Sequence, residues 1–460
     1  MNASAGGVAG NRGGLGESLA LHPTNAEELT VKKSSPALAS LAAIAALGLA
    51  ASPASAGGWH PDPPDSGSAT PVAGEVTTLA EGLLSPLSFA VGRRGTLDVA
   101  QDFAGLLTRI TPDGATEILD SAAPGSGYSV GAVSKSSTRL GTTFYTMVVG
   151  AATNDPAQNM SVLKSIDRNG TIRTIGDIAG YEFSENPDSV NQYGFDNLDP
   201  ACAAQIPADG PPVSYTGLKD SNPYASLPAR RGVIVADAGM NALIRVDRNG
   251  GISTVAVLPP IPRAVPAEIA GGCGLPSCTV GLTYNLEPVP TDVERGPDGY
   301  LYVTSLPGGG GLNNGSVFRV DERTGESELV ATGFAGATGL AVNDDGDIFV
   351  AELFSGRISV VPAGSDTPEL FYAVNEPGAL ELHDGALYAS TDVLPPGGVQ
   401  EPDAEEPPVT EPPVEPAPPD GRIIRIEFED NDDDCGGGRW GHHGHHGSDS
   451  DFLGEEQEDQ

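Results

Sequence analysis

The stretch Ala337–Tyr372, ATGLAVNDDGDIFVAELFSGRISVVPAGSDTPELFY, decides the fold. Its Val, Ile and Phe residues fall into short runs, and such residues favour the half-buried surface of a β-sheet. The turn sequences NDDG, SG and PAG separate the runs, because Gly, Asn and Asp suit the backbone conformations of tight turns. The stretch therefore predicts four consecutive antiparallel strands. They are Gly339–Val342, Asp347–Ala351, Arg357–Val361 and Glu369–Tyr372.

The same four-stranded pattern recurs along most of the chain. The turn Asp-Arg-Asn-Gly, for example, occurs at 167–170 and again at 247–250. Units of this kind bury both faces of their small sheets only by stacking on one another, which is typical of a β-propeller. The predicted units begin at Leu87, Ser129, Tyr224, Thr291, Gly339 and Ala379.

The last unit is one strand short. It offers Ala379–Leu382, Ala386–Ser390 and Arg422–Phe428, whereas Glu75–Ala80 is a strand without a unit. Pairing the two terminal strands protects both of their edges. The sequence therefore predicts an all-β fold over residues 75–428, a six-bladed β-propeller of four-stranded antiparallel blades, closed by pairing of its N- and C-terminal strands.

The long inserts all fall between second and third strands or between blades. They therefore project from one side, here called the insert face, and the short turns lie on the opposite plain face. Variable loops on a rigid scaffold commonly bind ligands, so we expect an unknown small molecule or protein on the insert face. The inserts are Ala151–Asn159, Ala179–Asn222, Pro259–Pro290, Leu306–Gly315 and Val393–Gly421.

Two segments lack the apolar residues needed for a core. The Pro/Glu-rich insert at 393–421 and the acidic, His-containing tail at 429–460 are both predicted to be disordered. The chain has a net charge of −38. Such a charge repels nucleic-acid phosphates, so nucleic-acid binding is not expected. We expect a monomer.

The N-terminus resembles an export signal, with translation starting near Val31. Lys32 and Lys33 precede the apolar run Pro36–Ala51, and Ala54-Ser55-Ala56 supplies small residues for cleavage. This run is too short for a good membrane span. Residues 1–56 are thus an N-terminal extension and signal peptide (about 31–56), residues 57–74 are a linker, and the mature protein is expected to be secreted and extracellular.

The four cysteines favour a disulfide over a zinc site, because they form no CxxC pair and no His lies nearby. Cys273 and Cys278 are the preferred pair, since four residues between them make a tight loop. A bond from Cys202 into that same loop is the alternative. The remaining cysteine is Cys435.

Several motifs make the chain similar to the ScyD/ScyE family of secreted, NHL-like propellers. They are ENPD at 185–188, DSNPY at 220–224, VADAGMN at 235–241, and VPT at 289–291 before GPDG at 296–299. The resemblance covers about Val76 to Phe428. It implies an exported six-bladed propeller and carries over no catalytic residues.

Oxygen-bearing side chains from the inserts and strand ends are the candidate ligand site. They can converge on a central pocket and bind Ca²⁺, which prefers oxygen ligands. The alternative is that they cap strands and satisfy loop backbone groups. The candidates are Glu185, Asn186, Asp188, Asp220, Asn222, Asp237, Asn241, Thr291, Asp292 and Glu352.

Catalysis has less support. His383, the one histidine of residues 75–428, lies in a plain-face turn, so a Ser–His–acid mechanism is rejected. The leading hypothesis is a secreted binding or scaffold propeller. The alternative is an exported lactonase- or lyase-like enzyme acting on a small metabolite with Ca²⁺ at the central pocket. A weak transition-metal site is the remaining candidate, and it consists of His442, His443, His445 and His446.

Overall fold

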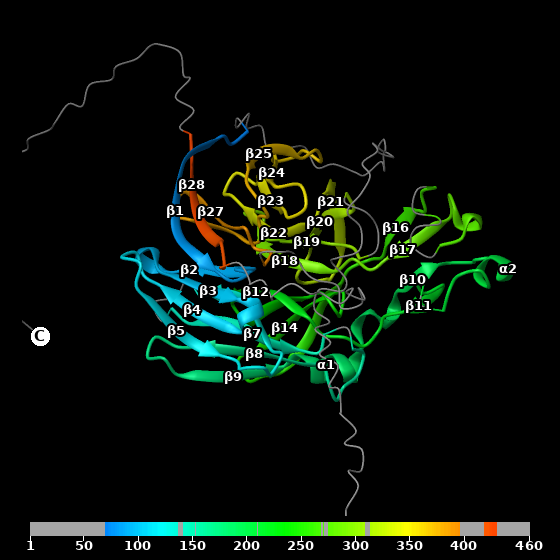
Figure 1. The fold of residues 1–460 in the computed structure, drawn as a ribbon, viewed down its shortest axis with the longest axis horizontal. Helices are drawn as coiled ribbons and strands as arrows, with labels where there is room; N and C mark the ends of the chain where they lie inside the picture. The colour runs from blue at the N-terminus through cyan, green and yellow to red at the C-terminus, as the bar shows by residue number, and fades with distance from the viewer. Residues whose placement is uncertain are drawn as a thin grey trace, which may run out of the picture. The chain divides into compact units, whose positions relative to one another are not determined.

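The computed structural model describes residues 70–136, 141–151, 153–208, 210–267, 270, 275–308, 313–395 and 418–429. Within these residues, strands form seven four-stranded antiparallel sheets (Figure 1). The predicted signal peptide, most of the Pro/Glu-rich insert and the tail with its four histidines lie outside the described residues.

The first three sheets follow the predicted units. Each is a simple meander in which consecutive strands pair. The first sheet contains β2 (Ser88–Val91), β3 (Leu97–Gln101), β4 (Leu106–Ile110) and β5 (Thr116–Ser121). The second contains β6 (Ser129–Lys135), β7 (Thr143–Val149), β8 (Met160–Ile166) and β9 (Ile172–Asp177). The third contains β12 (Pro223–Ala229), β13 (Gly232–Asp237), β14 (Ala242–Asp247) and β15 (Ile252–Val257).

The next two sheets are also meanders. The fourth contains β18 (Pro290–Arg295), β19 (Leu301–Ser305), β20 (Gly315–Val320) and β21 (Ser327–Phe334). The fifth is the opening stretch of the sequence analysis, and its turn Asn343–Gly346 has a structural role, because Oδ1 of Asn343 accepts from the backbone N–H of Asp345 and Asp347 at 3.1 and 2.8 Å. Its strands are β22 (Ala337–Val342), β23 (Ile348–Glu352), β24 (Arg357–Val361) and β25 (Glu369–Ala373).

The sixth sheet combines the two ends of the array. Its order is β1 (Ala73–Leu83), β28 (Gly421–Phe428), β27 (Ala386–Thr391) and β26 (Leu380–His383). The pairing of β1 with β28 is antiparallel and runs from Ala73 opposite Phe428 to Leu83 opposite Gly421. The spare strand of the sequence thus lies where the last unit lacks one.

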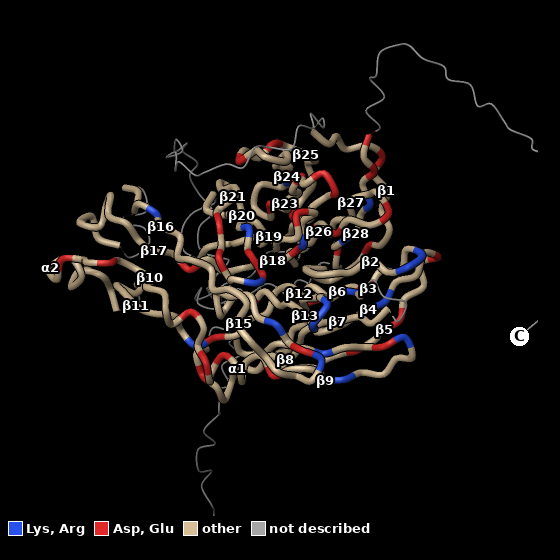
Figure 2. The backbone as a smooth tube through the Cα atoms, turned by 180° about the vertical axis from the view of Figure 1, so that it is seen from behind, with Lys and Arg blue, Asp and Glu red and all other residues tan. Residues whose placement is uncertain are grey.

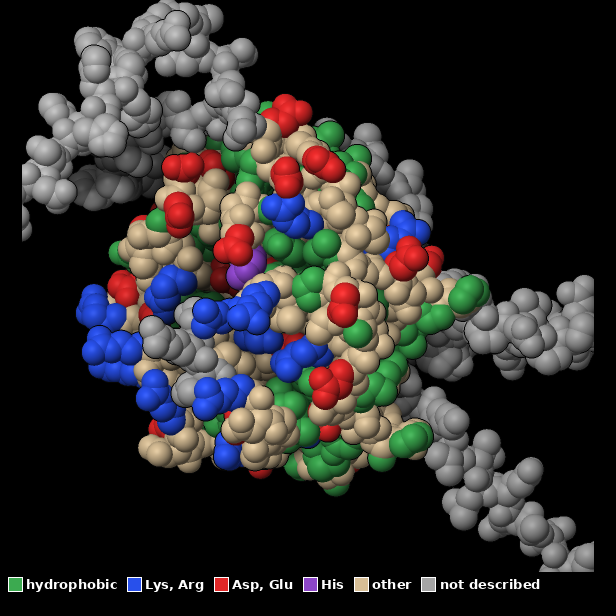
Figure 3. Space-filling view, turned by 90° about the vertical axis from the view of Figure 1, so that its left-hand side faces the viewer, with side chains coloured by type: hydrophobic (Ala, Val, Ile, Leu, Met, Phe, Trp, Pro, Cys, Tyr) green, Lys and Arg blue, Asp and Glu red, His purple; other side chains and the backbone are tan. Residues whose placement is uncertain are grey.

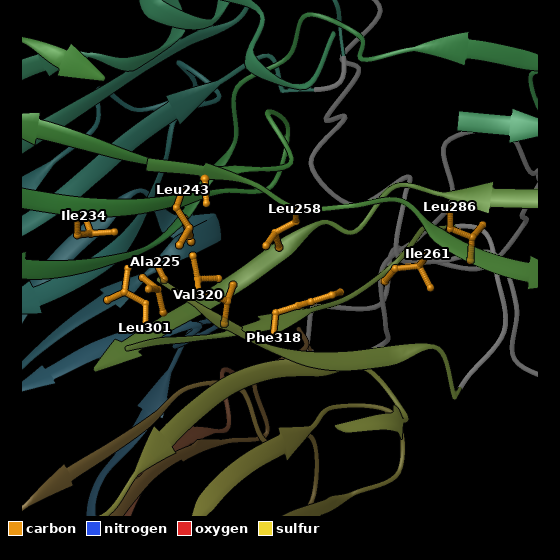
Figure 4. Close-up of a cluster of buried hydrophobic side chains, with 13 residues drawn as sticks. Ala225, Ile234, Leu243, Leu258, Ile261, Leu286, Leu301, Phe318 and Val320 are labelled. Atoms are coloured by element: carbon orange, nitrogen blue, oxygen red, sulfur yellow. The ribbon is translucent and has the colours of Figure 1, made fainter. Parts of the chain in front are cut away.

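Apolar clusters fill the space between consecutive sheets. Between the third and fourth sheets, Ile234 and Leu243 pack with Leu301, Phe318 and Val320 (Figure 4). The sixth sheet packs on the first in the same way, through a cluster that includes Tyr388 and Phe89. The leading strands β2, β6, β12, β18, β22 and β26 contact one another in that order, and β26 contacts β2. Four-stranded sheets packed in this manner define a β-propeller.

The seventh sheet differs from the prediction, in which the inserts 179–222 and 259–290 are loops. Each insert contributes two strands to this sheet, so the sequence of neither insert alone predicts it. Its order is β11 (Ser214–Thr216), β10 (Gln192–Phe195), β17 (Thr283–Leu286) and β16 (Ile261–Ala264). The inserts also contain α1 (Ile178–Glu185), η4 (Pro187–Val190), α2 (Pro200–Ala203) and η5 (Ser277–Thr279).

The preferred disulfide between Cys273 and Cys278 is wrong. Cys278 is bonded to Cys202, which lies 76 residues earlier, and their Cα atoms are 6.0 Å apart. The pairing of β10 with β17 joins the two inserts and thereby brings α2 to η5. The alternative weighed from the sequence, a bond from Cys202 into this loop, is therefore the observed one.

Short 3-10 turns complete the fold, namely η2 (Arg93–Gly95) and η3 (Asp102–Ala104). In the part of the chain described, no helix has the length and apolar character required to cross a membrane.

Candidate functional site

The helix α1 carries the most unusual buried group of the insert face. Asp177 begins the helix as its N-cap, accepting from the backbone N–H of Gly180 at 3.0 Å, and Asn186 ends it with a positive φ of 44°. Glu182 follows Ile178 by four residues and Ala179 by three, so the three side chains share the buried helix face. The Glu182 side chain is consequently 0% exposed.

Four buried acceptor atoms on α1 and η4 have no side-chain hydrogen-bond donor within the described residues. They are both carboxylate oxygens of Glu182, Oδ1 of Asn186 and Oδ1 of Asp188. Buried oxygens of this kind are costly unless a donor or a cation satisfies them. Glu182, Asn186 and Asp188 are called the insert site from here on.

The pKa values in the insert site are raised. Burial, followed by the charges of Asp237 and Asp188, raises the pKa of Glu182 to about 8, although a backbone hydrogen bond from Asp220 partly offsets the rise. Burial also raises the pKa of Asp188 to about 6, although hydrogen bonds from Asn241 and Tyr193 partly offset it. Near neutral pH Glu182 therefore keeps its proton, which a bound cation would displace, whereas Asp188 is mostly ionised.

Asp188 is held by side chains from two other elements. Its Oδ2 accepts from Nδ2 of Asn241 at 2.9 Å and from the Tyr193 hydroxyl at 3.2 Å. Gly217 lies so close that a Cβ there would overlap with the Asp188 carboxylate. Nδ2 of Asn186 donates to the carbonyl oxygen of Gly217 at 3.1 Å, so this glycine supports two members of the site.

Asp237 acts on the insert site through its charge, and both of its carboxylate oxygens already accept hydrogen bonds. Its Oδ2 accepts from the Ser221 hydroxyl at 2.7 Å, and its Oδ1 accepts from the backbone N–H of Asn222 at 2.8 Å and of Gly239 at 3.0 Å. Burial raises the pKa of Asp237 to about 7. Asp237 and Asn222 therefore fix the loop that enters the third sheet.

A similar arrangement occurs at the ends of the second strands β23 and β3, where a polar side chain accepts a backbone hydrogen bond from the segment that enters its own sheet. Glu352 accepts from the backbone N–H of Ala335 at 2.8 Å and from Nε of Arg357 at 2.8 Å. Gln101 accepts from the backbone N–H of Leu84 at 3.0 Å. In each case a polar side chain binds the segment that enters its own sheet, which is the kind of contact that the structural alternative predicts for Glu352.

Two of the candidates lie at the centre of the propeller instead. Thr291 and Asp292 of β18 line a pocket together with residues from four other sheets, among them Tyr224 and Thr338. Oδ2 of Asp292 accepts from the backbone N–H of Leu340 at 2.8 Å, and burial raises the pKa of this carboxyl to about 7. Burial likewise raises the pKa of Glu294, and it raises the pKa of Glu381 to about 8.

The predicted single ring of oxygens is thus divided. Asn186, Asp188 and Asn241 come together on the insert face, and Asp220 contributes its charge to Glu182. Thr291 and Asp292 line the central pocket, and Glu185 is exposed. Among the residues that the structure describes, no three His, Cys, Asp or Glu side chains lie close enough to hold a metal ion by themselves. Any cation at the insert site must therefore also use amide, backbone or water oxygens.

Sequence reasoning missed Glu182 and Glu287. Glu287 follows β17, and burial, then the charge of Asp188, raises its pKa to about 7. A signal for Glu182 exists in the sequence, because Asp177 is a good N-cap and Ile178, Ala179 and Glu182 have helical spacing. Glu287 has no comparable local signal.

Comparison with known proteins gives structural matches alone. No protein family and no curated protein matches the sequence. A PQQ-bound aldose sugar dehydrogenase from Streptomyces coelicolor matches with 13% identity and a TM-score of 0.46, over 80% of this chain and 100% of that chain. A gluconolactonase from Xanthomonas campestris matches with 11% identity and a TM-score of 0.43, over 78% and 90%.

A virginiamycin B lyase from Staphylococcus aureus matches with 15% identity and a TM-score of 0.37, over 68% of this chain and 81% of that chain. Identity and TM-scores at this level carry no argument about activity. The chain is an all-β protein of the β-propeller class, and the function has to be argued from the sites themselves.

Proposed function

We propose that this protein is an exported binding protein, a six-bladed propeller closed by β1 and β28, which takes Ca²⁺ at the insert site. The observation that carries the proposal is the Glu182 carboxylate, which is 0% exposed, has no side-chain donor in the described part of the chain, and is only partly compensated by the backbone N–H of Asp220. Ca²⁺ accepts carboxylate, amide, backbone and water oxygens together, which suits the mixture of donors here.

The motifs of the ScyD/ScyE resemblance support the same site. ENPD supplies Asn186 and Asp188, and VADAGMN supplies Asp237 and Asn241. Four residues of these motifs thus hold or border the insert site. We therefore propose a cation-dependent binding role for the motif residues of this chain, on the exterior of the cell.

Calorimetric titration with Ca²⁺ at about pH 8, where Glu182 loses its proton, tests this function. The native protein should bind one Ca²⁺, and Glu182→Gln should weaken binding at least about tenfold. Glu185→Gln is the matched control, because Glu185 lies on the same helix and is exposed. Absence of binding heat from the native protein, or equal losses in both variants, would refute the proposal.

A second candidate function is catalysis at the central pocket, as a lactonase- or lyase-like enzyme with Ca²⁺. It is favoured by Asp292, whose pKa of about 7 suits a general acid or base near neutral pH. Turnover of a lactone panel that is lost in Asp292→Asn and kept in Glu182→Gln would support this candidate over the first.

A further inference from the structure

The plain face carries a basic patch although the chain has a net charge of −38. The turns that join first to second strands and third to fourth strands in the first three sheets carry exposed arginines on this face. Blue side chains gather on one part of this face in Figure 3, around the described chain's one histidine, His383. The basic patch consists of Arg93, Arg94, Arg168, Arg230, Arg231 and Arg248.

The charges of the basic patch are available to a partner. None of its six arginines forms an ion pair within the described residues, whereas the nearby Asp98 is buried and bound by Arg109 and Lys135. Asp167 and Asp247 lie in the same turns, where each accepts backbone hydrogen bonds at Oδ1. The patch therefore keeps an excess of positive charge.

The chain emerges from the last strand on this same face. β27 begins at Ala386, directly after the plain-face turn His383–Gly385, and Ala386 pairs with Glu427. β28 therefore ends on the plain face, in the sheet that packs on the first sheet and its Arg93–Arg94 turn. Residues 430–460 follow, and they contain ten Asp and Glu residues against one Arg.

We propose that the acidic tail, residues 430–460, docks on the basic patch and covers it. The two charges are complementary, and a tail of 31 residues at about 3.3 Å each can extend up to about 100 Å. Tethering makes the contact intramolecular, so modest attraction suffices. The acidic insert at 396–417 is a poor competitor, because β27 and β28 anchor it on the insert face.

Fluorescence of Trp440 in the full chain tests the docking, after Trp59→Phe removes the other tryptophan. At low salt the anisotropy of Trp440 should be high, and it should fall at about 0.5 M salt, where charges are screened within a few ångströms. Arg93→Glu with Arg94→Glu should cause the same fall at low salt. Arg422→Glu, at the insert-face end of β28, is the control and should leave the anisotropy high.

A second variant keeps the test decisive if the patch variant fails to fold. Replacing the ten tail acids by Asn and Gln leaves the sheets untouched and should lower the anisotropy, whereas replacing the six acids of residues 396–417 should not. Anisotropy that is independent of salt and of both tail and patch substitutions would overturn the proposal. The patch would then be open to a separate anionic partner.

Discussion

Nδ2 of Asn241 donates a 2.9 Å hydrogen bond to Oδ2 of Asp188, which lies 53 residues earlier in the chain. Oδ1 of the same Asn241 accepts from the backbone N–H of Val289 at 3.0 Å. One amide group thereby joins the third sheet to both inserts. Asp188 is left with Oδ1 unpartnered within the described residues, and its charge contributes to the raised pKa of Glu182. The geometry that organises the inserts thus also creates the insert site.

The stability of the protein without Ca²⁺ should fall as pH rises from about 5 to about 8. The pKa of Glu182 is about 8 and that of Asp237 about 7 in the folded protein, both above their ordinary values. Such groups hold protons more tightly when folded, so their contribution favours folding at low pH and is lost as pH rises through the folded pKa.

Thermal unfolding against pH, with and without Ca²⁺, measures this dependence. Ca²⁺ should offset the loss, so its stabilising effect should grow with pH. In Glu182→Gln the pH slope and the Ca²⁺ effect should both shrink. A Ca²⁺ effect that is equal at pH 5 and pH 8 would contradict the assignment of Glu182 as a proton-displacing ligand.

Gly217→Ala should abolish Ca²⁺-dependent stabilisation. A methyl group at this position overlaps with the carboxylate of Asp188, so the side chain has to leave its place. The control is Gly308→Ala, since a Cβ there meets nothing within 4 Å. The shift of the melting temperature on adding Ca²⁺ should vanish in the first variant and persist in the second.

Breaking the Cys202–Cys278 bond should destabilise the seventh sheet and weaken Ca²⁺ binding with it. The bond closes a loop with a sequence separation of 76 residues, and bonds of that span contribute about 4 kcal/mol in the chain-entropy account. Peptide mapping without reduction should recover the Cys202–Cys278 link. Cys278→Ser should lower the melting temperature, and an unchanged melting temperature would argue against a stabilising role.

Glu352→Gln should lower the stability of the protein and leave its Ca²⁺ affinity unchanged, whereas Glu182→Gln should weaken Ca²⁺ binding. Glu352 is 0% exposed and pairs with Arg357, but the Arg357 side chain is 39% exposed, so solvent screening makes the cost of losing this pair smaller than for a fully buried pair. We still expect a loss of stability in chemical denaturation, with Ca²⁺ affinity unchanged in the folded protein. A loss of affinity without a loss of stability would return Glu352 to the list of candidate ligands.

The strands could be predicted because their signals are local. The turn Asn343–Gly346 and the apolar runs beside it define the fifth sheet without reference to the rest of the chain. The seventh sheet could not be predicted, since β10 and β17 are about 90 residues apart and pair across two inserts. The disulfide depends on that pairing, so it too is visible only in three dimensions.

The same contrast between local signals and long-range contacts applies to the site residues. Position at a strand end selected both Asp237 and Glu352, but their partners are backbone and side-chain groups that only the structure reveals. Glu185 begins the motif ENPD and is a candidate for that reason, whereas burial of Glu182 is set by the face of α1. A helical interpretation of residues 178–185 would have exchanged the two.

The most direct test is a crystal structure of the full chain grown with Ca²⁺ at about pH 8, with diffraction data collected where calcium scatters anomalously. We expect an anomalous peak within coordination distance of Glu182, Asn186 Oδ1 and Asp188 Oδ1. A map with no peak there, or with a peak at Asp292 in the central pocket alone, would contradict the proposed site.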